Sequence, residues 1–287
     1  MKECLVSVVL LTKNAGAEFE KTLESIRDQK VEFPYEIVVV DSGSTDGTTD
    51  LARRYGAKVH EIPPSEFNFG RTRNYGFSLA EGDFIVTISQ DVVPCDTTWL
   101  GKMVSPFLTD DTVAAVQGKT VVPGNSEVFY WERAGQFYFT SESRAWIEKY
   151  RCGLSFVNCA VRRDFWEKNP LGTISFSEDK FFQKRIHDSG RKIHVSADAL
   201  CFHGHQYTLR SLIGRLKNEG VGWRHVGVRY GLKDCLSDIY RNKWLVRESL
   251  RSWRNGKFHS LQELLFPILR PTFIYYGNNR SVTSRNN

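Results

Sequence analysis

Acidic residues stand at two places in this chain where they could take part in a reaction. Asp91 stands two residues after the largely apolar run Phe84–Ser89, and a carboxylate at the end of a buried strand can hold a divalent cation against a diphosphate. Asp179, in the pair Glu178-Asp179, heads a predicted helix and could act as a general base. Both positions also have ordinary structural explanations, because aspartate favours turns and acids are stabilised at helix N-termini.

Two histidines follow these acids along the chain. His203-Gly204-His205 presents imidazoles on alternating sides of an extended segment. Standing alone, this pattern is more typical of a surface than of a metal site. A hydrolytic zinc site would need further histidine or carboxylate partners at a recognisable spacing, and the sequence has none nearby.

A short polar loop, Asp41–Gly47, could bind a nucleotide. Its carboxylate can accept a hydrogen bond from a nucleobase N–H, while its hydroxyls and backbone N–H groups suit ribose or phosphate. The alternative is a plain turn in which Ser44 or Thr45 caps the next helix. Arg71 and Arg73 could neutralise phosphate, although a solvated helix face is the ordinary explanation. The absence of GxGxxG after the first strand and of GxxxxGK[ST] disfavours a dinucleotide-binding dehydrogenase and a P-loop enzyme.

Alternating buried strands and helices would position these residues. Their order predicts an α/β fold with a mostly parallel central sheet and helices on both faces. Because ligands of such sheets bind at the carboxyl ends of the strands, Thr12–Asn14, Asp41–Asp46 and Asp91 should converge on one cleft. The predicted strands are Leu5–Leu11, Glu36–Val40, Lys58–Ile62, Phe84–Ser89, Val113–Val122, Leu154–Val161, Arg191–Val195 and Ala199–Phe202. The predicted helices are Ala17–Gln29, Thr48–Tyr55, Arg71–Ala80, Ser126–Phe139, Ser177–Ser189, Leu209–Glu219, Asp234–Trp253 and Leu261–Leu269.

The composition indicates a folded chain in a reducing compartment. Hydrophobic residues make up 41% and charged residues 25% of the 287 residues, which argues against disorder. The six cysteines form no CxxC pair, which disfavours a disulfide framework or a structural zinc site. The N-terminal apolar run is too short for a signal peptide, and no run of about eighteen apolar residues predicts a membrane span. We therefore expect a cytoplasmic protein.

The charge is unevenly distributed along the chain. From Tyr207 onward there are 15 Lys+Arg against 5 Asp+Glu, whereas the preceding residues have 24 against 28. A basic, aromatic tail of this kind predicts an anionic partner. Because no nucleic-acid motif accompanies it, a membrane surface is the better expectation, and nucleic acid is not expected. A homodimer formed through the tail helices is the alternative.

In their order and spacing, these motifs resemble the family 2 inverting glycosyltransferases of the GT-A fold, and within them a bacterial rhamnosyltransferase-like group. FNFGRTRNYG followed by a Gln-Asp pair is the most group-specific part, and VDSGSTDGT is the most family-specific. The resemblance implies a GT-A domain over residues 1–206, with a nucleotide-sugar-binding half (1–91) and an acceptor-binding half (92–206), and a helical extension over 207–287. The matching stretches are VSVVLLTKN, EIVVVDSGSTDGT, EIPPSEFNFGRTRNYG, SQDVVP, FSEDKFF and CFHGHQYTLRSL.

The resemblance also implies roles for individual residues. Asp41 would bind the N3–H of the base, Asp91 and His203 would hold Mg²⁺ or Mn²⁺ on the diphosphate, and His205 is not a first choice. Asp179 would be the catalytic base, with Glu178 beside it. Asn158 falls in the strand near the acceptor and receives no role. The residues expected to border the donor nucleotide are Thr12, Asn14, Asp41, Ser42, Arg71, Arg73 and Gln90.

One departure from the family pattern concerns its DxD motif. Here the motif is Ser89-Gln90-Asp91, so the first acid is missing, and we interpret this as a trait of the subgroup. The departure bears on how strongly a metal is held. The implied chemistry is a single displacement at the anomeric carbon, which inverts its configuration and requires no covalent enzyme intermediate.

The leading hypothesis is transfer of L-rhamnose from dTDP-L-rhamnose to a bacterial cell-surface glycan or lipid-linked oligosaccharide, at the inner face of the plasma membrane. Thymine and uracil share the same N–H edge, so a UDP-hexose, UDP-N-acetylhexosamine or UDP-galactofuranose donor is the first alternative. A catalytically silent, membrane-associated scaffold with the same fold is the second.

Overall fold

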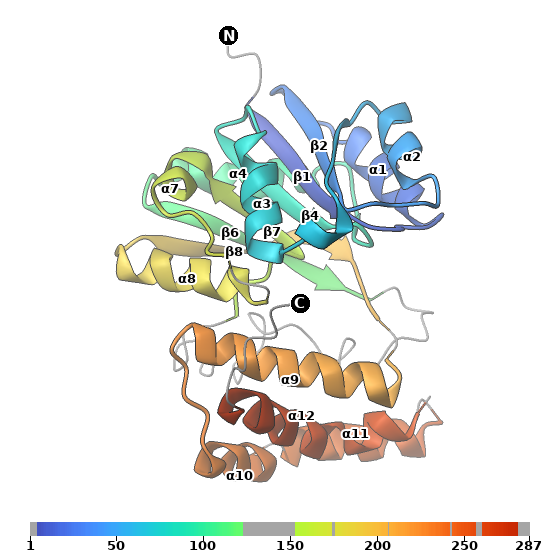
Figure 1. Cartoon of the computed structure of the whole chain (residues 1–287), viewed down its shortest axis with the longest axis vertical. Helices are drawn as coiled ribbons and strands as arrows, with labels where there is room; N and C mark the ends of the chain where they lie inside the picture. Colours follow the sequence, from blue (N-terminus) through green and yellow to red (C-terminus); the bar gives the residue numbers. More distant parts are fainter. Residues whose placement is uncertain are drawn as a thin grey trace. The chain divides into compact units, whose positions relative to one another are not determined.

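The computed structural model describes residues 5–122, 153–173, 176–205, 207–241, 243–256 and 260–280. These residues form two compact units, one ending at His203 and the other beginning at Gly204 (Figure 1). The helix predicted over Ser126–Phe139 lies outside the described residues. Each unit has its own architecture.

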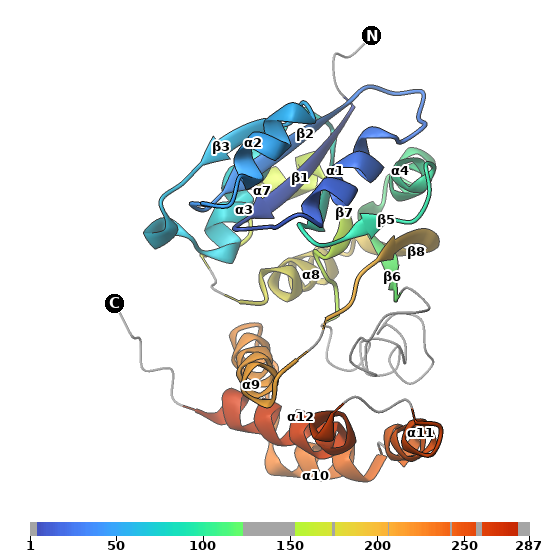
Figure 2. The ribbon, with the colours of Figure 1, turned by 90° about the vertical axis from the view of Figure 1, so that its right-hand side faces the viewer.

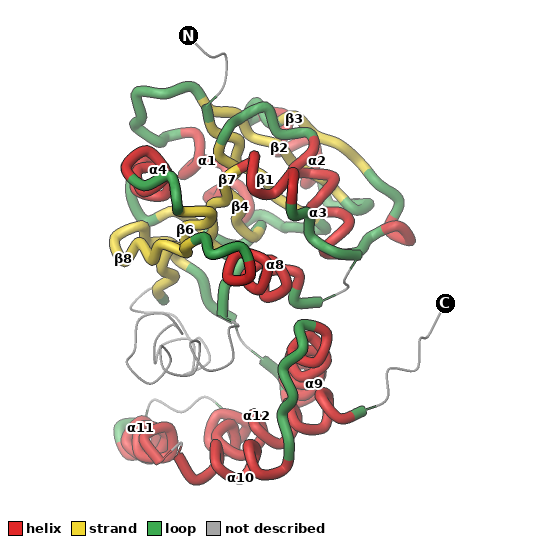
Figure 3. The backbone as a smooth tube through the Cα atoms, turned by 90° about the vertical axis from the view of Figure 1, so that its left-hand side faces the viewer, coloured by secondary structure: helices red, strands yellow, loops and turns green. Residues whose placement is uncertain are grey.

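The first unit contains an eight-stranded sheet in the order β3-β2-β1-β4-β7-β6-β8-β5 (Figure 3). The pairs from β3 to β4 are parallel, as is β6 with β8, whereas β7 is antiparallel to both β4 and β6. The strands are β1 (Val6–Thr12), β2 (Tyr35–Asp41), β3 (Lys58–Glu61), β4 (Phe84–Ser89), β5 (Val93–Pro94), β6 (Val113–Val121), β7 (Asn158–Arg162) and β8 (Lys192–Phe202).

Helices cover both faces of this sheet (Figure 2). Alternate residues of β1 point to opposite faces, so that Val8 and Leu10 join one apolar core and Val9 joins the other. The first core includes side chains of α1 (Phe19–Arg27), α2 (Thr48–Arg54) and α4 (Trp99–Thr109). The second core includes side chains of α3 (Phe69–Ser78), α7 (Arg163–Lys168) and α8 (Glu178–Asp188). The predicted α/β class with a mostly parallel sheet is confirmed.

Several element predictions need correction. The two strands expected over Arg191–Val195 and Ala199–Phe202 are one strand, β8, with an irregularity in the middle. Gly118 of β6 pairs with Ser196, but the next residue of β6 pairs with Leu200, so residues 197–199 leave the ladder. Because these residues interrupt the strand pattern, the sequence of this one strand resembles that of two short strands. The sequence predictions also did not include α4, α7 or β5.

Buried Asn158, on β7, ties three segments of the first unit together. Its side-chain oxygen accepts a hydrogen bond from the Trp99 indole N–H, and its amide nitrogen donates to the carbonyls of Lys119 and Ala199. A Cβ atom on the neighbouring Gly118 would lie 2.4 Å from that nitrogen. Asn158 therefore has a structural role, and glycine at 118 makes room for it.

In its described residues, the second unit contains four helices: α9 (Leu209–His225), α10 (Leu232–Arg241), α11 (Lys243–Arg254) and α12 (Leu261–Asn279). The single helix predicted over Asp234–Trp253 is thus two helices, and α12 continues ten residues past the predicted end at Leu269. α9 and α12 touch through glycines, because a Cβ on Gly220 would meet the Ile274 carbonyl at 2.2 Å. No helix in the described part of the chain is both long and apolar enough to cross a bilayer.

Candidate functional site

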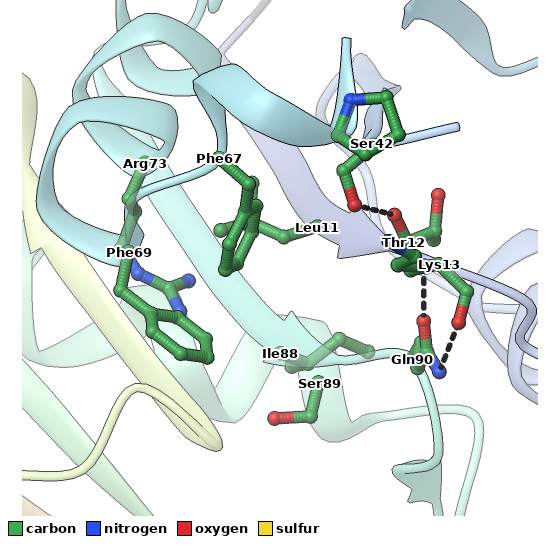
Figure 4. Close-up of a pocket in the computed structure, with 11 residues that line it drawn as sticks. Leu11, Thr12, Lys13, Ser42, Phe67, Phe69, Arg73, Ile88, Ser89 and Gln90 are labelled. Carbon is green, nitrogen blue, oxygen red and sulfur yellow. Dashed lines mark hydrogen bonds between the residues drawn. The ribbon is translucent and has the colours of Figure 1, made fainter. Parts of the chain in front are cut away.

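A pocket of ≈ 380 Å³ opens in the first unit at the carboxyl ends of β1, β2 and β4 (Figure 4). Its position is the one expected for a ligand site of a parallel sheet. One wall is apolar and comprises Leu11, Ile88 and the rings of Phe67 and Phe69, which pack edge to face with centroids 4.8 Å apart. Sequence reasoning did not identify this wall. The lining residues are Leu11, Thr12, Lys13, Ser42, Pro64, Phe67, Phe69, Arg73, Ile88, Ser89 and Gln90.

The Asp41 carboxylate organises the loop beside the pocket. It is fully buried and accepts four hydrogen bonds, from the Thr12 hydroxyl at 2.7 Å, the Gly43 and Ser44 backbone N–H groups at 2.9 and 2.7 Å, and the Ser44 hydroxyl at 2.5 Å. A carboxylate has about four acceptor positions. A nucleobase N–H could therefore bind Asp41 only if one of these donors moved, and the Ser44 side chain is the one that rotation of a single bond would release.

The helix after this loop is not capped as the sequence suggested. The Ser44 hydroxyl is directed to Asp41, and it is the Asp46 carboxylate that accepts the Thr48 backbone N–H. Asn14, expected near the nucleotide, joins two loops instead: its side-chain oxygen accepts the Thr45 N–H, and its own N–H donates to Ser44. Thr12 and Ser42 line the pocket, as expected of donor-binding residues.

Gln90 connects the end of β4 to the end of β1. Its amide oxygen accepts the Lys13 N–H at 2.8 Å, and its amide nitrogen donates to the Lys13 carbonyl at 3.3 Å (Figure 4). A carboxylate at this position could accept the first hydrogen bond but could not donate the second. The glutamine of the Ser89-Gln90-Asp91 motif thus fixes the backbone that lines the pocket.

The two arginines expected to meet phosphate lie in different surroundings. Arg71 is exposed and donates to the Glu66 carbonyl. Arg73 lines the pocket but is 7% exposed, and its Nη1 donates to the Thr87 hydroxyl at 2.6 Å. Its Nε lies 3.3 Å from Glu178, whose side chain is 8% exposed. Arg73 therefore connects the pocket with the acidic pair.

The acidic pair at the start of α8 divides into an inward and an outward carboxylate. Burial raises the pKa of Glu178, the Arg73 cation opposes that rise, and the neighbouring Asp179 carboxylate adds to it. Asp179 is 14% exposed, and one of its oxygens lies 3.0 Å from the ammonium of Lys180. Its other oxygen accepts the Lys180 backbone N–H. Asp179 is thus the more accessible carboxylate of the pair.

A candidate metal site lies at the end of β8. The short strand β5 pairs with β8, with Val93 opposite Phe202, and this pairing brings Asp91 to the end of β8. The His203 Nε2 lies 3.8 Å from the Asp91 Oδ1, with the imidazole 8% and the carboxylate 45% exposed. One carboxylate and one imidazole, with the carboxylate open to solvent, suit a cation that takes its remaining ligands from phosphate and water.

His205 belongs with this pair. Ligand atoms of Asp91, His203 and His205 all lie within 4.8 Å of one another, although the sequence did not make His205 a first choice. Imidazoles separated by one residue of extended backbone usually point apart, so spacing alone could not predict this arrangement. The three residues could supply up to three ligands to one ion.

Comparison with known proteins gives a consistent family. Residues 7–169 match the model of glycosyl transferase family 2. The O-antigen chain rhamnosyltransferase RfbN of Salmonella typhimurium is 30% identical over 228 residues, which cover 75% of this chain and 71% of that protein. The O-antigen chain rhamnosyltransferase WbaN of Salmonella anatum is 32% identical over 227 residues, with the same coverage.

Two solved structures share the fold. A Pyrobaculum calidifontis mannosyltransferase, in complex with GDP-Man and Mn²⁺, superposes with a TM-score of 0.56 at 19% identity and covers 95% of this chain and 69% of its own. The glucosyl-3-phosphoglycerate synthase of Mycobacterium tuberculosis, in complex with Mn²⁺, UDP-glucose and phosphoglyceric acid, has a TM-score of 0.56 at 21% identity, with 78% and 77% coverage. At these identities the likeness concerns the fold alone, and it confirms the GT-A class.

The buried ion pair predicts that removing its cation alone destabilises the fold more than removing both charges. The substitution Arg73→Met would leave the Glu178 carboxylate buried without its partner, and we expect the free energy of unfolding to fall by about 3–5 kcal/mol at neutral pH. Adding Glu178→Gln should restore more than half of this loss. The loss should also shrink as the pH falls, because protonation of Glu178 removes the buried charge. Urea unfolding at several pH values measures these differences.

Arg71→Met is the matched control for this experiment, since Arg71 is an exposed arginine on the same helix. It should change the free energy of unfolding by less than about 0.5 kcal/mol. The buried pair would be contradicted if Arg73→Met lowered the free energy of unfolding no more than Arg71→Met does, or if its effect did not depend on pH.

Proposed function

We propose that this chain, which belongs to the family 2 glycosyltransferases, transfers L-rhamnose from dTDP-L-rhamnose to a hydroxyl of a cell-surface glycan or lipid-linked oligosaccharide. The two relatives that match three quarters of the chain at 30% and 32% identity are both O-antigen chain rhamnosyltransferases. The observation that carries the proposal is that the strand-end pocket, the Asp91–His203 pair and the Asp179 carboxylate all belong to one unit.

The apolar wall of the pocket supports a thymine nucleotide. Thymine differs from uracil by a methyl group at C5, and an apolar cavity gains free energy by burying that methyl. Phe67 and Phe69 offer ring faces and edges to a base, and Leu11 and Ile88 complete the apolar lining (Figure 4). Asp41 would accept the N3–H after the Ser44 hydroxyl rotates away. A UDP-linked donor would use the same N–H but leave part of the apolar wall uncovered.

Asp91 and His203 would hold Mg²⁺ or Mn²⁺ on the donor diphosphate, with His205 as a further ligand. Their oxygen and nitrogen atoms suit such a cation, and the exposed Asp91 leaves room for phosphate oxygens. The bound ion would supply charge stabilisation for the departing diphosphate. Gln90 would contribute indirectly, because it holds the β1 end against which the nucleotide lies.

Asp179 would act as the base in a single displacement. As the acceptor oxygen forms its bond to the anomeric carbon, its proton passes to Asp179 and the bond from that carbon to the diphosphate oxygen breaks. The product is the inverted glycoside and the nucleoside diphosphate. Lys180 would orient the base, since it contacts both oxygens of Asp179 through its backbone N–H and its ammonium. Glu178 would fix the start of α8 through Arg73.

The donor proposal predicts a preference for the thymine methyl. We expect dTDP to bind about tenfold more tightly than dUDP, because one methyl in an apolar pocket gives discrimination of about that size. The preference should narrow in a Phe67→Ala, Phe69→Ala double variant and persist in Tyr75→Ala, an exposed aromatic on α3. Calorimetric titration of dTDP, dUDP and UDP measures the methyl and the 2′-hydroxyl separately. The alternative donors would be favoured if dTDP and dUDP bound with equal affinity and if a UDP-sugar raised the Tm of the protein more than dTDP-L-rhamnose does.

The metal assignment predicts that Mn²⁺ affinity falls only when a ligand residue is replaced. We expect Asp91→Asn and His203→Ala each to weaken Mn²⁺ binding in the presence of dTDP by at least about tenfold, because each removes one of few protein ligands. His194→Ala, which changes an exposed histidine of the same strand, should have no effect. Electron paramagnetic resonance of free Mn²⁺ measures the affinity directly. Unchanged affinity in both ligand variants would place the ion elsewhere.

The base assignment predicts a loss of turnover without a loss of donor binding. Asp179→Asn should lower the release of dTDP from dTDP-L-rhamnose about 100-fold or more, with a lipid-diphosphate glycan as acceptor. The affinity for dTDP should change by less than about twofold, since Asp179 does not line the pocket. Asp188→Asn, on an exposed residue at the other end of α8, is the matched control. Near-normal turnover in Asp179→Asn would require another base.

A further inference from the structure

Two helices of the second unit carry large apolar side chains on their exposed faces. On α10, Leu232, Leu236 and Tyr240 are 56%, 58% and 70% exposed. Their spacing of four residues aligns them along one side of the helix. On α11, Val246, Leu250 and Trp253 share a side in the same way and are 42%, 42% and 62% exposed. We call these six residues the apolar face.

The apolar face is not needed for packing within the second unit. α12 lies between α9 on one side and α10 and α11 on the other, and both of the latter helices contact it (Figures 1 and 2). The buried side chain of α10 is Cys235, and its Asp238 accepts a hydrogen bond from the buried Tyr230. α10 thus packs through one side and leaves the other uncovered.

In the described part of the second unit, acidic side chains are buried or bonded within the unit, whereas most basic side chains are exposed. Of its acids, Glu263 is fully buried, Glu219 pairs with Arg270 at 2.9 Å, and Asp238 and Asp234 bond to Tyr230 and Gly231. Its basic side chains are mostly exposed instead. The exposed ones are Arg210, Arg215, Arg229, Lys233, Arg241, Lys243, Arg247, Arg251, Arg254 and Arg280.

On α11 the cations border the apolar face directly. Lys243, Arg247, Arg251 and Arg254 lie on the flank of the side that carries Val246, Leu250 and Trp253. The Lys243 ammonium also lies 4.1 Å from the centre of the Tyr240 ring, at the junction with α10. Apolar side chains with an aromatic belt and flanking cations are the composition of a helix that lies in the plane of a membrane interface.

We propose that α10 and α11 dock on an anionic lipid bilayer, with the apolar face in the acyl-chain boundary and the cations of α11 on the phosphate headgroups. A second copy of this chain is a poorer occupant, because a symmetric contact would bring the same cations together and the described acids of α10 are engaged within their own unit. Docking would hold the second unit at the surface where lipid-linked acceptors lie. It does not depend on the donor or on the catalytic residues.

Flotation of the full chain with vesicles tests this proposal. We expect binding to phosphatidylcholine vesicles that contain phosphatidylglycerol, little binding to phosphatidylcholine alone, and a loss of binding at high salt. Arg247→Gln with Arg251→Gln should weaken binding to the anionic vesicles about fivefold for each cation removed. Leu236→Glu with Trp253→Glu should abolish it. Because these side chains are exposed, the variants should keep the wild-type Tm and circular dichroism.

Matched controls are Arg54→Gln and Leu108→Glu, which change an exposed arginine and a 62% exposed leucine of the first unit and should bind as the wild type does. Brominated acyl chains should quench tryptophan emission in the wild type and less in Trp253→Phe. Failure of the wild type to float, or equal flotation of the apolar-face variants, would overturn the proposal. Light scattering that showed a dimer dissociated by the same variants, without flotation, would assign the face to a second copy.

Discussion

The buried pair of Arg73 and Glu178 is the contact on which the arrangement of the first unit's site depends. It joins α3, which borders the donor pocket, to the first residue of α8, and the next residue is Asp179. Removing two charges from water is costly, and the pair is compensated by the Thr87 hydroxyl and by the Phe156 ring, 4.9 Å from the guanidinium carbon. This one buried contact fixes the start of α8 against the helix that borders the pocket.

Gln90, the middle residue of the Ser89-Gln90-Asp91 motif, connects the ends of two strands. The neutral amide both accepts from and donates to the Lys13 backbone, so it extends the hydrogen bonding between the ends of β1 and β4 beyond the sheet. Position 89 carries no acid, so Asp91 is the one carboxylate of the motif, and His203, which directly follows β8, lies 3.8 Å from it although it is 112 positions further along the chain. The proposed metal site would thus combine one carboxylate with a histidine that is distant in sequence.

The sequence predicted those elements that depend mainly on neighbouring residues in the chain. β4 was predicted residue for residue, because its mostly apolar and β-branched residues are typical of a buried strand and the polar Gln90-Asp91 follows them. α12 continues past its predicted end at Leu269 although it contains Pro267 and Pro271, which disfavour a helix, and its close packing on α9 at Gly220 and Gly277 overrides that preference. The inward turn of Arg73 could not be predicted, since its partner lies 105 residues away. The same holds for the apolar pocket wall, which strands and a loop assemble together.

The division of the pocket wall bears on how such enzymes diversify. Leu11 and Ile88 belong to core strands, so selection on stability constrains them whatever nucleotide is bound. Phe67 and Phe69 are only partly buried and lie outside the sheet, between η1 (Pro64–Glu66) and the body of α3. Mutations there can reshape one side of the pocket while the strands, the Arg73–Glu178 contact and Asp179 stay unchanged. The shape of the pocket and the geometry of the acidic pair can therefore change independently in this chain.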